Sequence, residues 1–411
     1  MIKRIKNIVG TEERKRLLSN FFSLSILQGA DYILPLLTMP YLFRVLGAEK
    51  FGLVAFSTST LFFFNILVEY GFNLSATRDI SKNIGSKQKI QEIFATVLTA
   101  KLFLLLVSFF LLSLLIVIFD KFNNDWQLFY LSFLLVIGNA LLPTWFFQGI
   151  EEMKYISYFS LGARLFFTLG IFIFISSPDD YLLQPLMNGG GMILIGIFSI
   201  HFVKKKYDIK FSFQSFNKIR RVLKDGLNIF ITEFIPNLYS NFSNILLGFF
   251  ATMEIVGYYS LATKVIDVFN RLIYIVRNIT FPYLNKNNRN FKKVAKVTIL
   301  GGAVLSFFAY STTYYLVPFI FGTKAYNSLV YIYILAFSPF FMAILQTYGV
   351  NKLLVEKQDS LYKKIIITGS LFGFLLSTTL VPFFSAIGAS ITLISTRGVL
   401  AGLVYFKTKY K

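Results

Sequence analysis

Stretches of about 20 mostly apolar residues dominate this sequence, and they restrict what the chain can fold into. A helix needs about 20 such residues to cross a bilayer. The chain has 411 residues, 55% of them hydrophobic, which is more apolar residue than a single soluble core of this length can hide. We therefore predict an all-α polytopic membrane protein with spans near residues 19–43, 52–71, 93–118, 128–148, 155–176, 182–202, 227–250, 257–283, 297–321, 328–349, 365–381 and 389–406.

The distribution of Lys and Arg predicts how these spans are oriented. If the N-terminus is cytoplasmic and the spans alternate, the cytoplasmic segments hold 31 of the 41 Lys and Arg, and the external loops hold 4. Cytoplasmic loops of membrane proteins carry this kind of excess. The sequence thus predicts 12 transmembrane helices with both the N- and C-termini cytoplasmic. The net charge of +21 is then a record of topology and gives no reason to expect nucleic-acid binding.

A basic loop divides the chain near its midpoint. We predict an N-terminal lobe of helices 1–6 over residues 1–203, a basic cytoplasmic linker over 204–226, and a C-terminal lobe of helices 7–12 over 227–411. Six spans on each side make an internal duplication plausible, because many transporters are built from such repeats.

An alignment of the two halves of the sequence, with the second half shifted by 205 residues, supports this duplication. The shift aligns Glu49 with Glu254 and Gly52 with Gly257. With six spans per half, the repeats start on the same side of the membrane. The expected architecture is two six-helix lobes around a central cavity.

Polar residues within the spans are the candidate functional residues, because each is costly in lipid unless it faces a partner or water. The predicted seventh and eighth helices carry them at helical spacing, on one face each. The spans together hold six Lys and Arg against four Asp and Glu, and this excess of positive charge favours an anionic substrate. The cationic candidates for substrate binding are Arg164, Lys264, Arg271, Arg397, Arg44 and Arg78. The candidates for an acidic or polar lumen or for ion coupling are Asp31, Glu69, Glu233, Asn237, Ser240, Asn244, Asp267 and Asn65.

Snorkelling towards the cytoplasmic surface is an alternative explanation for three ionisable residues near that end of their spans. Glu69, Lys101 and Arg277 are all placed where a long side chain can reach the headgroup region. Arg164, Arg271 and Arg397 lie deeper by the same span map and are harder to explain in this way.

Several classes of chemistry are excluded by composition. The chain has no Cys and one His, so thiol catalysis and the usual zinc sites are absent, and we expect no metal and no cofactor. Neither a Walker-A pattern nor an Asp-x-Asp pair occurs, which argues against ATP hydrolysis and against a metal–sugar-nucleotide site. We expect a transporter and no enzyme.

Four stretches resemble bacterial polysaccharide flippases, the Wzx-type O-antigen transporters. They are Arg44–Gly52, Glu69–Asp79, Pro143–Met153 and Gly257–Ala262. Pro143–Met153 is the most specific of them, and with the span pattern the resemblance covers essentially the whole chain. It implies the fold of the multidrug/oligosaccharidyl-lipid/polysaccharide exporter superfamily.

The resemblance also implies a substrate and a mechanism. The expected activity is translocation of undecaprenyl-diphosphate-linked oligosaccharide from the inner to the outer leaflet of the bacterial cytoplasmic membrane, by alternating access. H⁺ or Na⁺ is the candidate counter-ion, and a monomer that associates with polysaccharide polymerase machinery is expected. Trp145 and Gln148 become candidate sugar contacts, although Trp145 is also explained as an interfacial anchor. The alternatives are a polysaccharide polymerase or other membrane enzyme of the same pathway, and a multidrug exporter of the same superfamily.

Overall fold

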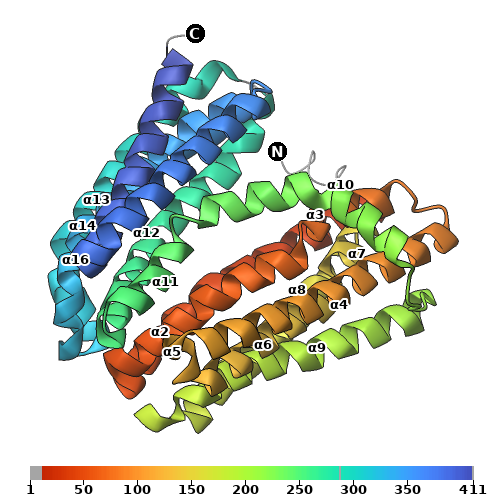
Figure 1. Ribbon diagram of the computed structural model, residues 1–411. Coiled ribbons are helices and arrows are strands. Elements are labelled where there is room, and N and C mark those ends of the chain that lie inside the picture. Colours follow the sequence, from red (N-terminus) through yellow and green to blue (C-terminus); the bar gives the residue numbers. More distant parts are fainter. Residues whose placement is uncertain (1–11, 287, 410–411) are drawn as a thin grey trace. The chain divides into compact units, whose positions relative to one another are not determined.

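The computed structural model describes residues 12–286 and 288–409, and the side chains within them except those of 12–28, 30–32 and 288. Helices make up nearly all of this part of the chain, and no strand occurs in it. The described residues form two compact units (Figure 1). One unit contains residues up to Val45 and Leu61–Glu233, and the other contains Leu46–Thr60 and Phe234–Lys411.

Long helices alternate with short ones along the described part of the chain. Those before the midpoint of the chain are α2 (Glu12–Glu69), α3 (Phe72–Ser81), α4 (Lys87–Ile118), α5 (Asp120–Asn123), α6 (Trp126–Leu141), α7 (Thr144–Gly149), α8 (Lys154–Phe174) and α9 (Leu183–Tyr207), with a short 3₁₀ turn at Pro178–Leu182. Those after it are α10 (Phe216–Phe234), η2 (Ile235–Asn237), α11 (Asn241–Phe250), α12 (Met253–Lys286), η3 (Asn288–Asn290), α13 (Phe291–Phe321), η4 (Thr323–Ser328), α14 (Leu329–Leu335), α15 (Ser338–Ile344), the π-helical η5 (Leu345–Leu354) and α16 (Asp359–Lys409).

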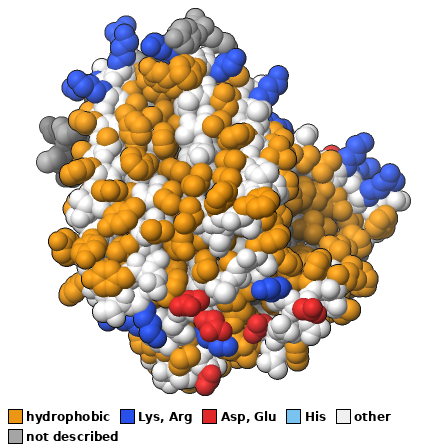
Figure 2. All heavy atoms as spheres, turned by 60° about the vertical axis from the view of Figure 1, so that its left-hand side comes forward, with side chains coloured by type: hydrophobic (Ala, Val, Ile, Leu, Met, Phe, Trp, Pro, Cys, Tyr) orange, Lys and Arg blue, Asp and Glu red, His pale blue; other side chains and the backbone are white. Residues whose placement is uncertain are grey.

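The described helices confirm that the chain is a multi-pass membrane protein. Eight helical stretches within the described residues are long and apolar enough to cross a membrane. On the face in Figure 2, hydrophobic side chains form a broad band, with Lys and Arg gathered along its upper rim. The exposed side of α13 includes Val297, Phe307 and Phe319, which are 64, 73 and 80% exposed. Such large exposed apolar surfaces are stable only against lipid or a partner.

Two of these stretches contain a backbone break. Within α2, Gly47 has φ 72° and ψ 170°, and within α16, Ser385 has φ 51° and ψ −133°. Gly47 adopts this left-handed conformation without a side-chain clash, whereas Ser385 is strained there. Each stretch therefore consists of two helical segments that meet at a sharp change of direction.

Close packing explains the glycine-rich sixth span. It forms one regular helix, α9, that runs through Pro185. A Cβ on Gly189 would lie 2.5 Å from Cβ of Leu134 on α6, and one on Gly138 would lie 2.5 Å from Cβ of Met192 on α9. Glycines on both helices thus let the two backbones approach, as small residues do in membrane helix pairs.

Adjacent glycines on α9 allow a matched test of this packing. Gly189→Ala should destabilise the protein by about 1–3 kcal/mol, because an added methyl group has no room. Gly190 has open space where its Cβ would be, so Gly190→Ala should leave stability unchanged or slightly raised, since Ala favours helix. The midpoints of thermal unfolding in detergent give the comparison, and equal midpoints for the two variants would contradict it.

A second close contact involves the glycines that the 205-residue shift aligns. A Cβ on Gly52 would lie 1.8 Å from the carbonyl oxygen of Met253, and one on Gly257 would lie 2.0 Å from that of Ala48. The second segment of α2 and the start of α12 therefore cross with their backbones in contact. The two aligned glycines lie at the same crossing.

The predicted seventh helix is not continuous. It was expected over 227–250, but α10 ends at Phe234, the 3₁₀ turn η2 follows, and α11 begins at Asn241. Pro236 lies in the interruption, where it lacks the N–H that a continuing helix needs. Glu233 lies on α10, Asn237 in η2, Ser240 in the turn before α11 and Asn244 on α11, so the predicted stripe of these four residues does not run along one continuous helix.

The basic loop after α9 is short and is tied to α4. Only 208–215 are non-helical before α10 begins. Lys87 Nζ lies 2.6 Å from Asp208 Oδ2, and Lys218 Nζ lies 2.5 Å from Glu92 Oε1. The hydrogen bond and charge of Lys87 hold the pKa of the exposed Asp208 carboxyl below its usual range. These contacts fix the start of α10 against the first turns of α4.

Candidate functional site

A closed ring of polar contacts joins α12, α15 and α16 in the unit that contains Phe234–Lys411. Arg397 donates a hydrogen bond from Nη1 to Ser338 Oγ. Ser338 Oγ donates to Asn270 Oδ1 at 3.0 Å, and Asn270 Nδ2 donates to Asp267 Oδ1 at 3.1 Å. Arg397 Nη2 closes the ring, 3.8 Å from Asp267 Oδ1. We call Asp267, Asn270, Ser338 and Arg397 the α12–α16 ring.

The ring holds Arg397 rigidly but leaves part of its guanidinium unused. The Arg397–Asp267 separation is too long for a hydrogen bond, and Nε of Arg397 is buried without a hydrogen-bond partner. Arginine presents five donors in a fixed planar fork. Because the Arg397 side chain is 13% exposed, only its exposed donors can reach a ligand.

Two further cations lie near the ring along α12. Lys264 is exposed, and Asp267 and Arg271 are its charged neighbours. Arg271 is half-buried. The side chain of Asp267 is 52% exposed, against 13% for that of Arg397. Lys264 and Arg397 therefore both lie near the Asp267 carboxylate, and these two cations leave an excess of positive charge there.

The other unit holds a second polar cluster, on α2, α3 and α4. Lys101 Nζ lies 2.9 Å from Glu69 Oε1 and 3.0 Å from Oε2, and Asn73 Nδ2 donates to Oε2 at 3.0 Å. The side chain of Lys101 is fully buried, and that of Glu69 is 14% exposed. Glu233, half-buried at the end of α10, is close enough for the charge of Glu69 to act on it.

These contacts correct the explanation by snorkelling for Lys101 and Glu69. A snorkelling side chain places its charge in water or among headgroups, whereas Lys101 is enclosed by protein. The spacing of Lys101 in the sequence indicates which way it faces. Four buried residues lie on the same face of α4 at helical spacing, namely Phe94, Leu98, Leu105 and Ser108. Lys101 is therefore on the protein-facing side of its helix.

Asn65 makes a polar contact in the same unit. Asn139 Nδ2 on α6 donates to Asn65 Oδ1 on α2 at 2.8 Å. Both residues lie on long apolar helices, where such a pair links two spans. The contact gives Asn65 a packing role whether or not it lines a substrate path.

The remaining cationic candidates are spread over the same unit. Arg164 on α8 is half-buried, and Arg44 on α2 is exposed. Arg78 on α3 lies 3.4 Å from the neighbouring Asp79, with both side chains about half exposed at 55 and 43%. The described contacts do not bring these three arginines together into one cluster.

Trp145 and Gln148 lie on α7 in an aromatic core. Trp145 is 1% exposed, and its ring centroid is 5.4 Å from that of Phe94. Thr77 Oγ1 lies 3.1 Å from the carbonyl oxygen of Trp145 and 3.3 Å from Gln148 Oε1. A sugar ring cannot stack on an indole enclosed in this way, so the arrangement argues against both the sugar contact and the interfacial anchor expected for Trp145.

The other polar candidates lie in or near the interrupted segment. Asn241 Nδ2 donates to Asn237 Oδ1 at 3.0 Å. Ser240 precedes α11 and is half-buried, and Asn244 on α11 has a buried Oδ1 without a hydrogen-bond partner. Asp31 lies in α2, and its side chain is outside the described part of the structure.

Comparison with known families decides which family the chain represents. The family model described as "Polysaccharide biosynthesis protein" matches residues 17–288. The chain belongs to this family. It is also 30% identical over 394 residues to an Escherichia coli (strain K12) protein named "Putative O-antigen transporter", with 94% of this chain and 95% of that protein covered. A Shigella dysenteriae protein of the same name is 27% identical over 383 residues, with 92 and 96% covered. The resemblance predicted from four short stretches is confirmed.

Solved structures identify the fold of this family member. The fold matches a structure titled "Lipid II flippase MurJ, inward closed conformation" with a TM-score of 0.71, at 15% identity, covering 96% of this chain and 87% of that one. It also matches an inward-facing multidrug resistance MATE family transporter of the MOP superfamily with a TM-score of 0.69, at 14% identity, covering 94 and 96%. The chain therefore has the transporter fold that these two proteins share.

Proposed function

We propose that this protein is a flippase for undecaprenyl-diphosphate-linked oligosaccharide, acting in the bacterial inner membrane for O-antigen or other surface polysaccharide biosynthesis. The observation that carries the proposal is the excess of positive charge around the α12–α16 ring. Lys264 and Arg397 both lie near the Asp267 carboxylate, and the oxygens of a diphosphate would give these cations further charge-assisted hydrogen bonds. The names of the full-length relatives support the same substrate class.

The physical problem of moving such a lipid fits a non-enzymatic transporter. The sugar and diphosphate cannot enter hydrocarbon without a polar path, whereas the lipid tail never needs to leave it. Cations fixed within membrane-spanning helices provide that path without breaking a covalent bond. The cycle would proceed by alternating access with H⁺ or Na⁺ as counter-ion, in a monomer that associates with the polymerase machinery.

The proposal includes a topology of twelve spans with both termini in the cytoplasm. The breaks at Gly47 and Ser385 each allow one long stretch to serve as two spans. The α10–α11 segment and the charged α12 supply two more beyond the apolar stretches. The excess of Lys and Arg in alternate loops supports the orientation, with lobes over 1–203 and 227–411 joined by the linker 204–226.

The function can be tested by removing charge from the α12–α16 cluster in cells that lack the native gene. Lys264→Gln and Arg271→Gln should each lower surface polysaccharide about tenfold or more, because a charge-assisted hydrogen bond contributes about 1.5–3 kcal/mol. Arg164→Gln tests the cationic candidate of the other unit in the same assay. Lys286→Gln, an exposed cation on the same helix, is the matched control and should restore wild-type levels.

Membrane extracts distinguish the flippase from its alternatives. Cells with an inactive flippase should accumulate lipid-linked oligosaccharide and carry no repeat units at the surface, at normal protein levels. If the protein polymerised units after translocation, single units would still reach the surface. Wild-type polysaccharide from a Lys264→Gln/Arg271→Gln double variant would remove the cluster from the mechanism.

A further inference from the structure

A groove at the start of α13 combines cationic side chains with apolar ones. It has a volume of about 420 Å³ and is lined by Phe291, Lys292, Ala295, Lys296, Ile299, Leu300, Ala303 and Tyr348. This volume lies in the range of about 300–1,000 Å³ typical of small-molecule sites. None of these residues belongs to the α12–α16 ring.

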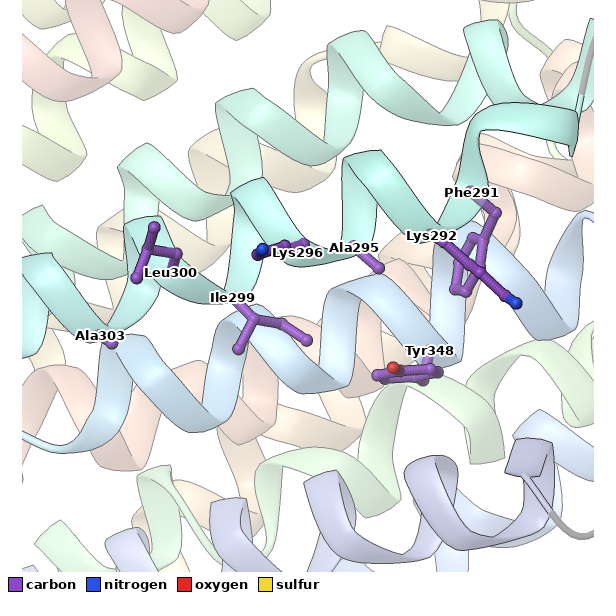
Figure 3. Close-up of a pocket in the computed structure, with 8 residues that line it drawn as sticks. All are labelled: Phe291, Lys292, Ala295, Lys296, Ile299, Leu300, Ala303 and Tyr348. Carbon is purple, nitrogen blue, oxygen red and sulfur yellow. The ribbon is translucent and has the colours of Figure 1, made fainter.

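The groove changes from cationic to apolar along its length. Lys292, Lys296, Ile299 and Ala303 follow one another along one side of α13 at helical spacing. Tyr348 on η5 lies beside the start of α13, with its ring centroid 5.7 Å from that of Phe291 (Figure 3). The two lysines lie in the first turns beside Phe291 and Ala295, and the lining residues further along α13 are all apolar. The groove thus offers charge at one end and a hydrocarbon surface at the other.

The charge at the first end is not neutralised within the described part of the protein. Lys292 and Lys296 are both exposed, and neither forms an ion pair or hydrogen bond with a described residue. Lys352 adds a third cation beside the groove, with its Nζ 5.4 Å from the ring centroid of Phe291. An anionic group at this end would therefore have several cations to bind.

The position of the groove determines what can fill it. Helix α13 is one of the stretches able to cross a membrane, and its residues Val297 and Val304 are 64 and 59% exposed. A groove on such a helix opens to lipid. If it were empty, the residues that line it would lose van der Waals contacts. The molecule that fills it must carry an anion at the membrane surface and an apolar chain within the bilayer.

We propose that this groove binds an anionic phospholipid as a resident molecule that is not transported. Its phosphate lies beside Lys292 and Lys296, and one acyl chain lies along Ile299, Leu300 and Ala303. The proposal goes beyond the flippase function, because this lipid comes from the surrounding membrane and stays in place. Each surface lysine enriches an anionic lipid about fivefold, so both lysines together give a clear preference over a zwitterionic lipid.

The absence of cysteine from the chain allows a test with single fluorescent labels. Ala303→Cys places a label in the apolar end of the groove. Val304→Cys places one at the same depth but about 100° around the helix. Each labelled protein is reconstituted in phosphatidylcholine vesicles that contain a minor fraction of either brominated phosphatidylglycerol or brominated phosphatidylcholine, whose bromines quench nearby fluorophores.

The expected result is a preference at one position only. Brominated phosphatidylglycerol should quench the label at position 303 several-fold more than brominated phosphatidylcholine does, and the two lipids should quench equally at position 304. Lys292→Gln/Lys296→Gln should abolish the preference, whereas Lys363→Gln/Lys364→Gln, which removes two exposed lysines at the start of α16, should keep it.

Three outcomes would overturn the assignment. Equal quenching by both lipids at position 303 would show that the groove does not select a charge. A preference that survives Lys292→Gln/Lys296→Gln would show that these lysines are not its source. Restored fluorescence on adding undecaprenyl phosphate, but not on adding unlabelled phosphatidylglycerol, would show that the groove holds the carrier lipid of the transport cycle instead.

Discussion

Replacing Lys101 by Met should cost about 3–5 kcal/mol of stability, because it leaves the carboxylate of Glu69 buried without its partner. Both Glu69 oxygens lie within 3.0 Å of Lys101 Nζ, and Lys101 is fully buried. Asn73 then remains as a single neutral donor to Glu69, which cannot offset a full charge. Thermal unfolding of purified protein in detergent, with expression level as a second readout, measures the effect.

A double variant separates loss of the ion pair from loss of packing. Lys101→Met/Glu69→Met removes both charges and keeps roughly the same volume, so it should recover most of the lost stability. Arg78→Met breaks the exposed Arg78–Asp79 pair of the same unit and should change stability by about 0.5 kcal/mol or less. A Lys101→Met protein as stable as the wild type would show that Glu69 is not held as an ion in this cluster.

The stability and transport readouts of the double variant carry different information. If Lys101→Met/Glu69→Met is stable and still delivers wild-type surface polysaccharide, the pair serves only to fold the first unit. If it is stable but inactive, the pair is part of the transport cycle. Glu233, within reach of the Glu69 charge, is then the next residue to replace.

Hydrophobic runs were enough to predict an all-helical membrane protein, because bilayer thickness fixes the length of each span. They were less informative about Lys101 and Glu69, which are 32 residues apart. A hydropathy profile gives the depth of a residue but not the direction in which its helix faces. The partner of a charged residue depends on that direction, which is set by packing against other helices.

The interrupted seventh helix shows where prediction from helical spacing fails. Helical spacing predicted one polar face from Glu233 to Asn244, although Pro236 lies within that interval. The proline was the better guide, since it removes a hydrogen bond that the spacing rule assumes. In the α12–α16 ring, by contrast, Asp267 and Arg397 were both predicted. Of the two residues that hold Arg397 in place, Asn270 was marked by its alignment with Asn65 under the 205-residue shift, and Ser338 had no signal beyond being polar.

The contact between Gly52 and Gly257 should be the least tolerant position in the second unit. Gly52→Ala would place a Cβ 1.8 Å from a backbone oxygen, and a backbone atom cannot rotate away as a side chain does. The two helices must separate, with a cost at or above the usual range of about 1–3 kcal/mol for overpacking. We expect little folded protein from this variant by size-exclusion chromatography. Gly301→Ala on α13, where a Cβ meets nothing within 4 Å, should behave as wild type.

Substitution of Gly257 gives a second test of the same helix crossing. Gly257→Ala should be as harmful as Gly52→Ala, since its Cβ would lie 2.0 Å from the carbonyl oxygen of Ala48. Once one substitution has pushed the helices apart, the other methyl group enters space that is already open, so the double variant should lose much less than the sum of the two single losses. Additive losses would mean that the glycines act at separate sites. The alignment of Gly52 with Gly257 would then reflect turn geometry in each half, and not a shared helix crossing.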